Sequence, residues 1–395
     1  MSQPIFPESA GCGFYVQVPF CTERCDYCSI AVSARPDRAA PYIKALKREV
    51  ERIRTRAERM SPSTFYIGGG TPTSLPLPQL EEILSFLPIP PGFRPEMTLE
   101  ARPETLSEPL LEQIEKKGVT RLSVGIEAFS LEHMRFLGRN AEANDPVDIL
   151  KRIRSGFSGK VAMDFIVGGD GYDPDLFRKN AERLYDAGLE HLSVYPLALE
   201  PRTVLKLGHS RGELDGLLED TTAHQWRRAT EDLRKMGWHH YEISNFSCNP
   251  DSICFHNVLV WKGGDYIGVG AGAHQKIGSV RTNNVRSIIT YEQVIEEGHA
   301  PFEEKEVLSE SAIWMEYLYT NARLSYGIPF EHIVPYVDKR DFSTYITTML
   351  QSGWIDPVHM EEGRLTFTFE GWMWLDELVE RLVSLRQNEG ESPAI

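Results

Sequence analysis

The stretch FYVQVPFCTERCDYC, residues 14–28, joins a short apolar run to three cysteines. Cys21, Cys25 and Cys28 have C-x3-C-x2-C spacing, which is tight enough for three thiolates to bind one inorganic group. The run FYVQVPF (14–20) is typical of a buried β-strand, so the cysteines fall in the loop after its C-terminal end. The stretch therefore predicts a metal site at the end of the first strand.

The cysteines alone leave several kinds of site open. A structural zinc ion takes four ligands, normally from two separated pairs, and Cys12 precedes the strand, so we expect it at the opposite end. Free or disulfide-bonded thiols are a second alternative, although the tight spacing would then serve no purpose. A [4Fe–4S] cluster on three thiolates would leave one iron open to an outside ligand.

Strand-like and helix-like segments alternate through residue 246. The strand-like segments are FYVQVPF (14–20), TFYIGGG (64–70), MTLEA (97–101), RLSVGIEAF (121–129), VAMDFIVGG (161–169) and HLSVYPLAL (191–199). Six β-then-α units predict parallel strands joined by right-handed crossovers. The fold class is therefore α/β, as an open sheet or a full or partial barrel, with its site at the C-terminal ends of the strands.

The pattern changes near residue 300. Helices flanking a small hairpin in residues 301–386 resemble a winged-helix module, and the acidic residues of this part favour packing or a protein partner over DNA. We expect four parts: an N-terminal segment (1–13), a domain with the cysteines (14–300), the winged-helix-like domain (301–386) and a disordered tail (387–395).

The composition limits the classes of function. Of the 395 residues, 41% are hydrophobic and 25% are charged, as in ordinary globular proteins. The formal net charge of −15 argues against a general affinity for nucleic acid or anionic lipid. No apolar run is long enough for a membrane span, and the N-terminus lacks the pattern of a signal peptide. With clustered cysteines, these features predict a reducing, cytoplasmic location.

The cysteine motif, with Tyr27 before its third cysteine, resembles that of the radical S-adenosylmethionine (SAM) enzymes. The motifs YVQVPFC, YIGGGTPT, RLSVGIEAF, SVYPLALEP, YEISNF and GGDYIGVGAGAH are similar to the oxygen-independent coproporphyrinogen III oxidase family, above all to its haem-chaperone branch, HemW. The resemblance runs from about Tyr15 to Ala273 and continues more weakly beyond. It implies a partial (β/α)6 barrel, a [4Fe–4S] cluster on the three cysteines, SAM at the open iron and an electron donor for reductive cleavage of SAM.

The same resemblance implies a set of SAM-binding residues. The loop GGGTPT (68–73) would hold the methionine amino group, which suits a glycine-rich loop whose backbone N–H groups can approach a ligand closely. An aspartate within VAMDFIVGG (161–169) would be costly to bury unless it were paired. The implied residues are Tyr15, Tyr27, Gly69, Gly70, Thr71, Glu100, Glu127, Arg139, Asp164 and Ala198. Solvent exposure of Glu100 and of Arg139, and a plain core role for Tyr15, are the alternatives.

The stretch SICFHNVLVW (252–261) is similar to a haem-linked motif, H-N-x-x-Y-W, of the haem-chaperone branch. Val260 stands where that motif has its tyrosine. The candidate haem or substrate residues are His256, Asn257, Trp261, Cys254 and His274. Ordinary hydrogen bonding of His256 and simple burial of Cys254 are the alternatives.

Four departures from the family pattern bear on function. Ile30 stands where the oxidase branch has a further cysteine, and the N-terminal extension of that branch is absent, which disfavours oxidation of coproporphyrinogen. Ser29 and Ile30 replace an acidic and an aromatic residue of the chaperone branch. Glu127 replaces a glutamine, and GGDGYD (168–173) replaces a G-L-P turn.

Three hypotheses follow. The leading one is a HemW-like radical SAM protein that binds a cluster, SAM and haem, and passes haem to a client protein. The second is a radical SAM methyltransferase or another HemN-like enzyme that acts on a tetrapyrrole or aromatic substrate. The third is a zinc-binding winged-helix protein that binds DNA.

Overall fold

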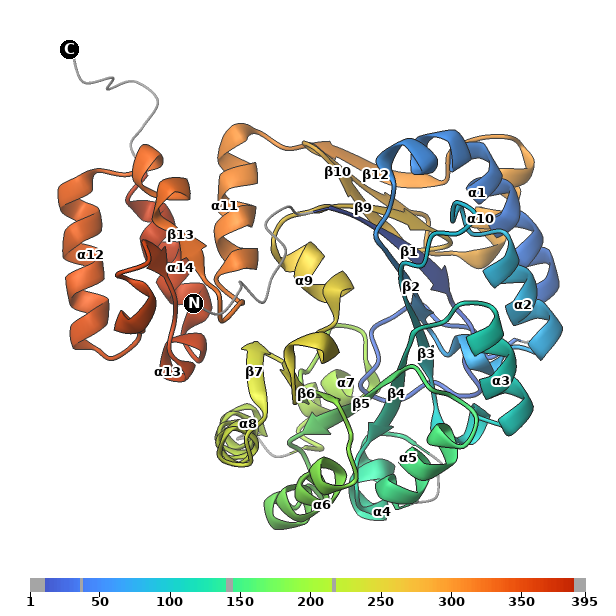
Figure 1. Ribbon diagram of the computed structural model, residues 1–395, viewed down its shortest axis with the longest axis horizontal. Helices are drawn as coiled ribbons and strands as arrows, with labels where there is room; N and C mark the ends of the chain where they lie inside the picture. Colours follow the sequence, from blue (N-terminus) through green and yellow to red (C-terminus); the bar gives the residue numbers. More distant parts are fainter. Residues whose placement is uncertain (1–10, 36–37, 140–144, 215–217, 387–395) are drawn as a thin grey trace.

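The computed structural model describes residues 11–35, 38–139, 145–214 and 218–386 and places twelve of its strands in one curved sheet (Figure 1). The strand order is β12-β11-β10-β9-β1-β2-β3-β4-β5-β6-β8-β7. The central six strands are mutually parallel, which confirms the six predicted β-then-α units. They are β1 (Cys12–Val18), β2 (Thr64–Gly69), β3 (Glu96–Ala101), β4 (Arg121–Glu127), β5 (Lys160–Val167) and β6 (His191–Pro196).

Helices cover the outer face of this sheet. Those between the parallel strands are α1 (Ala39–Met60), α2 (Leu77–Ser85), α3 (Glu108–Lys116), α4 (Leu131–Phe136), α5 (Pro146–Arg154) and α6 (Pro174–Asp186). After β6 come α7 (Val204–Ser210) and α8 (Leu218–Lys235). Within the described residues no pairing joins β12 to β7, so the sheet is open at both edges rather than a closed barrel.

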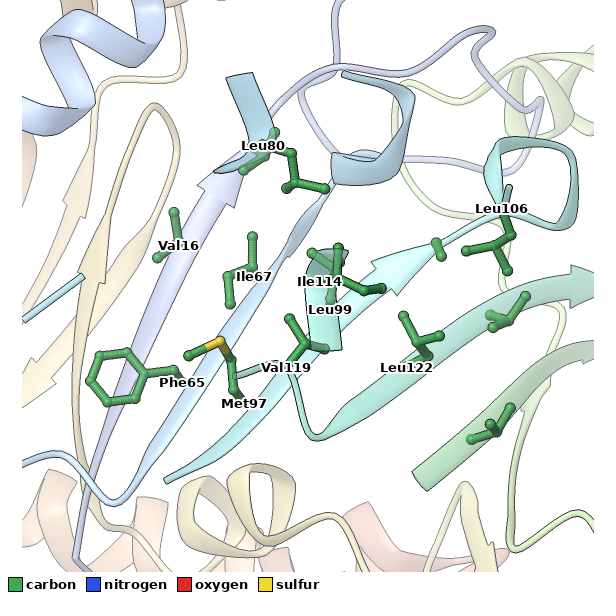
Figure 2. Close-up of a cluster of buried hydrophobic side chains, with 14 of the residues drawn as sticks. Val16, Phe65, Ile67, Leu80, Met97, Leu99, Leu106, Ile114, Val119 and Leu122 are labelled. Atoms are coloured by element: carbon green, nitrogen blue, oxygen red, sulfur yellow. The ribbon is translucent and has the colours of Figure 1, made fainter. Parts of the chain in front are cut away.

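Strand alternation decides which side chains reach the site. Phe65 and Ile67 of β2 lie beside Met97 and Leu99 of β3, and all four point toward the outer helices, as Figure 2 shows. The residues between them, Tyr66 and Thr98 among them, must point to the inner face because side chains alternate along a strand. The buried core therefore lies outside the sheet, and the polar residues of the strands line its inner face.

The strands that follow β6 extend both edges of the sheet. One edge gains β7 (His239–Glu242) and β8 (Asn245–Ser247), and the other gains β9 (Asp265–Val269), β10 (His274–Ile277), β11 (Val280–Asn284) and β12 (Phe302–Val307). Two further helices are α9 (Phe255–Trp261) and α10 (Ile288–Glu296). The helix α9 packs against β1 and β2 on the face opposite to α1, which brings residues 255–261 to the inner side (Figure 1).

The C-terminal part has a hydrophobic cluster of its own. It contains α11 (Glu310–Asn321), β13 (Ile328–Pro329), α12 (Lys339–Gln351), β14 (Arg364–Leu365), α13 (Phe369–Trp372) and α14 (Leu375–Ser384). Because β12 pairs with β11, the large sheet continues past residue 300, and we propose that the winged-helix-like domain begins after Val307 rather than at residue 301. Likewise β1 begins at Cys12, two residues before the predicted start, whereas the segment 387–395 lies outside the described residues.

In the part of the chain that the structure describes, every helix is either too short or too polar to cross a membrane.

Candidate functional site

A cavity of about 430 Å³ opens at the C-terminal ends of the parallel strands. All three motif cysteines line it, as do eight of the ten residues implied for SAM: Tyr27, Gly69, Gly70, Thr71, Glu100, Glu127, Asp164 and Ala198. The two others are Tyr15, which lines a neighbouring cavity, and Arg139, which lies behind the wall and contacts Glu127. The sequence motifs thus meet at one place, where parallel α/β folds bind ligands.

Backbone contacts fix the cysteine loop over the sheet. The N–H of Asp26 donates to the carbonyl of Leu137 at 3.0 Å, and the N–H of Cys21 donates to the carbonyl of Ser33 at 3.2 Å. The glycine loop is fixed to the same segment, because the N–H of Thr71 donates to the carbonyl of Phe20 at 2.7 Å. A Cβ on Gly70 would lie 2.4 Å from that same oxygen, so only glycine permits this close approach.

The three motif thiols are free, and burial raises the pKa of each above its ordinary value. Among the described residues, no three His, Cys, Asp or Glu side chains gather closely enough to hold one metal ion. A cluster does not require such a gathering, because each thiolate binds a different iron atom. The donor set therefore fits a [4Fe–4S] cluster better than a zinc ion, whose ligands must all surround one atom.

Arg102, which sequence reasoning missed, contacts one of these thiols. It is buried, and its Nη2 donates to Cys25 Sγ at 3.0 Å. Its Nη1 lies 3.5 Å from Glu23 and 3.8 Å from Glu104. The guanidinium lowers the pKa of Cys25 and so opposes the effect of burial. Arg102 directly follows the strand that carries Glu100, a predicted SAM ligand, and this position could have identified it from the sequence.

We expect Arg102→Gln to lower the reduction potential of the cluster. A cationic donor to a ligand sulfur favours the reduced cluster, which carries one more negative charge. A tenfold fall in the ratio of reduced to oxidised cluster at fixed potential corresponds to a shift of about 59 mV for one electron. The measurement is a redox titration followed by electron paramagnetic resonance, with Arg152→Gln as the control.

That control is matched because Arg152 bonds the backbone of Pro103, next to Arg102, at 2.7 Å and does not line the cavity. Equal potentials for Arg102→Gln and the wild type would show that the contact with Cys25 does not tune the cluster.

Three half-buried carboxylates lie on adjacent strands, toward the C-terminal part of each strand. Glu100 accepts from the N–H of Gly69 at 2.9 Å, and burial, with a further contribution from the charges of Asp164 and Glu127, raises its pKa to about 7. Asp164 accepts from Ser123 Oγ at 2.7 Å through Oδ2, and burial raises the pKa of this carboxyl also. Oδ1 of Asp164 is buried without a protein partner, so it is ready to accept from a ligand.

This arrangement fits SAM, which carries a cationic amino group, a cationic sulfur and ribose hydroxyls. The clustered carboxylates would attract the positive charges, and the orphaned oxygen of Asp164 suits a hydroxyl donor. The conformation of Gly69, with φ of 100°, brings its N–H to Glu100 at the cavity wall. Glu100 is half-buried and hydrogen-bonded, so the alternative of a solvent-exposed Glu100 is wrong.

Arg139 is buried and already has a carboxylate partner. Its Nη1 donates to Glu127 Oε1 and to the carbonyl of Gly125, both at 3.0 Å, and its Nη2 lies 3.7 Å from Glu104. Glu127 has a left-handed φ of 66° at an irregularity in the β4–β5 pairing, which turns it to this contact. The alternative of a solvated Arg139 at a helix end is therefore wrong.

The haem or substrate candidates separate into two groups. His256 and His274 line a second cavity, of about 630 Å³, which shares Ser29, Ile30 and Glu200 with the first. Cys254, Asn257 and Trp261 do not line either cavity.

Cys254 and Trp261, which lie outside both cavities, each contact another side chain. The Sγ of Cys254 lies 3.8 Å from Glu96 Oε1, and burial raises the pKa of this thiol to about 12. The ring of Trp261 lies 4.4 Å from the guanidinium of Arg323. Simple burial, the alternative for Cys254, thus matches its surroundings.

The comparisons with known proteins identify the family. Residues 15–184 match the model of the radical SAM superfamily. The chain is 30% identical over 386 residues to the haem chaperone HemW of Mycobacterium tuberculosis (strain H37Rv), covering 94% of each chain. It is 31% identical over 323 residues to HemW of Bacillus subtilis (strain 168), covering 80% of this chain and 84% of the relative.

The fold has a close structural counterpart. Coproporphyrinogen III oxidase (HemN) of Escherichia coli, a radical SAM enzyme, superposes with a TM-score of 0.76 at 18% identity, covering 95% of this chain and 90% of that one. The superfamily implies a [4Fe–4S] cluster, SAM and a reductant. On the identity and coverage shared with its relatives, the chain belongs to the HemW family of radical SAM proteins.

Proposed function

We propose that this protein is a haem chaperone, which holds a [4Fe–4S] cluster and SAM in the first cavity and haem in the second. The observation that carries the haem assignment is the position of His256, a histidine in the wall of a cavity that adjoins the cluster loop. The names of the relatives support it, because several are haem chaperones over most of this chain's length. We further propose a reducing compartment, in keeping with six cysteines that are all free.

The cysteines Cys21, Cys25 and Cys28 would hold the cluster, which supplies the electron for cleavage of SAM when a reductant is present. The glycine loop and Glu100 would together hold the amino group of SAM, and Asp164 would accept from its ribose. The three carboxylates are half-buried, so a bound cation would interact with them more strongly than at an open surface.

His256 has the features of an oriented metal ligand. Its Nδ1 shares a hydrogen bond of 2.9 Å with Thr64 Oγ1, which leaves Nε2 as the ring atom for a ligand. Burial lowers the pKa of the imidazole to about 4, so the ring is neutral at neutral pH, and Nε2 carries the lone pair when Nδ1 donates to Thr64. Within the described residues, ordinary hydrogen bonding, its alternative, accounts for Nδ1 alone.

We expect His256→Ala to weaken hemin binding at least tenfold and to change the Soret spectrum, because iron loses its protein ligand. The measurement is an anaerobic spectroscopic titration with hemin. The control is His224→Ala, which removes an exposed histidine of α8 and tests whether the loss of any histidine weakens hemin binding. His274→Ala tests the other histidine of the cavity. If only His274→Ala weakened binding, the ligand would be His274 instead, and if wild type bound no hemin, the chaperone proposal would fail.

The second candidate function is a radical SAM enzyme that acts on a tetrapyrrole or another aromatic substrate. It is favoured by the shared wall of the two cavities, since Ser29, Ile30 and Glu200 line both and a ligand in the second would lie beside the SAM site. Substrate-dependent formation of 5′-deoxyadenosine or S-adenosylhomocysteine would support the enzyme, and stoichiometric hemin binding without turnover would support the carrier.

A further inference from the structure

The second cavity is built from several separate segments of the chain. Its walls come from β1, from α9, from the strands β9 to β11, and from the loops 29–31 and 200–202. At about 630 Å³ it lies within the range of cavities that bind cofactor-sized molecules. It is therefore large enough for a ligand of its own beside SAM.

Tyr15 and His256 give this cavity an aromatic side, and both rings lie against Tyr66, which lines the neighbouring first cavity. The rings of Tyr15 and Tyr66 stack with centroids 5.9 Å apart, and that of Tyr66 lies 5.1 Å from the ring of His256. Gly13 makes room for the histidine, because a Cβ there would come within 3.1 Å of His256 Cε1. Flat ligands with extended π-systems pack well against such surfaces.

Two arginines stand in the cavity wall on separate loops. Arg202, after β6, has a left-handed φ of 65° and has no hydrogen bond or ion pair to any described side chain or backbone group. Arg286, after β11, donates from Nη2 to the carbonyl of Ser29 at 3.1 Å. The other ionised residue of the wall is the single carboxylate of Glu200.

This surplus of positive charge is local, since the whole chain carries a formal net charge of −15. Both histidines of the wall have lowered pKa values through burial, so they add no charge at neutral pH. A cavity with an aromatic side and two guanidinium groups complements a flat molecule that carries carboxylates. Guanidinium groups suit this task because they bind carboxylates with two parallel hydrogen bonds.

We propose that Arg202 and Arg286 bind the carboxylates of a planar tetrapyrrole in the second cavity, with its ring system against Tyr15. This rests on the proposed function, in which the ligand is haem. The proposal also gives a role to the departure at Ser29 and Ile30, since these residues form the partition between the tetrapyrrole and the SAM cavity.

The test compares hemin with hemin dimethyl ester, which lacks the free carboxylates. Each is titrated into the reconstituted protein as wild type, Arg202→Gln/Arg286→Gln, Glu200→Gln, and Arg211→Gln, an exposed arginine outside the cavity. We expect the double variant to raise the Kd for hemin about tenfold and to leave the Kd for the ester unchanged. Glu200→Gln should lower the Kd for hemin and leave the Kd for the ester unchanged, and Arg211→Gln should change neither Kd.

The controls separate this inference from the chaperone proposal. Iron and sulfide content of each variant establishes that the cluster is intact, and an unchanged Soret band shows that the axial ligand is retained. If the double variant bound hemin as tightly as wild type does, or lost hemin and ester equally, the arginines would not be carboxylate receptors. If wild type bound neither ligand, the chaperone proposal and this inference would both fail.

Discussion

Replacing Cys25 with alanine is expected to abolish the iron–sulfur cluster, so that iron after anaerobic reconstitution falls from about four atoms per chain to a small remainder. Cys25 is the most buried of the three thiols and the one that Arg102 contacts. With two thiolates left, two irons would lack protein ligands, and the buried Arg102 would lose its sulfur partner. Cys21→Ala and Cys28→Ala should behave alike, since each thiolate binds a different iron.

The matched control is Cys248→Ala, because Cys248 is free and does not line either cavity. Iron and sulfide analysis, together with the visible absorbance of the cluster, measures cluster loss, and circular dichroism measured alongside shows whether the variant is folded. Full iron content in Cys25→Ala would contradict the assignment of this loop. Zinc without sulfide in wild type would instead revive the zinc alternative.

The sequence predicted the scaffold well because strand and helix periodicities are local properties. Phe14, Val16 and Val18 alternate with Tyr15 and Gln17, and this pattern alone places the first group in the core. Strand ends were less accurate: the last two residues of VAMDFIVGG (161–169) lie beyond β5, because its glycines leave the extended conformation at φ of 107° and 90°.

Most of the predicted residues line one cavity, but their contacts were not predictable from the sequence. The contact between Arg102 and Cys25 joins segments far apart in the chain, and no local pattern encodes it. The motif HNVLVW was treated as one unit, yet it forms the helix α9, in which positions five apart point about 140° away from each other. His256 therefore lines the cavity while Trp261 lies against Arg323.

Substituting Glu100 with glutamine is expected to weaken SAM binding at least tenfold at pH 8 and to remove most of its pH dependence between pH 6 and 8. The pKa of Glu100 is about 7, so the wild-type carboxylate becomes charged across this window and its attraction for a cationic ligand grows as the pH rises. SAM binding near pH 7 should also release protons. Calorimetry of reconstituted protein in two buffers of different ionisation enthalpy measures both effects, with Glu112→Gln on the exposed face of α3 as the control.

The same substitution should stabilise the protein when SAM is absent. Because burial raises the pKa of Glu100 from 4.5 to about 7, the folded chain holds a proton that the unfolded chain has already lost between these pH values. The free energy of unfolding therefore falls as the pH rises through this window, by about 1–3 kcal/mol for a partly exposed group. Glu100→Gln removes this loss, so its melting temperature at pH 8 should exceed that of wild type, whereas at pH 4 the two should be nearly equal. A variant that bound SAM normally and melted lower at pH 8 would show that Glu100 is a structural carboxylate, and that the amino group of SAM is held elsewhere in the cavity.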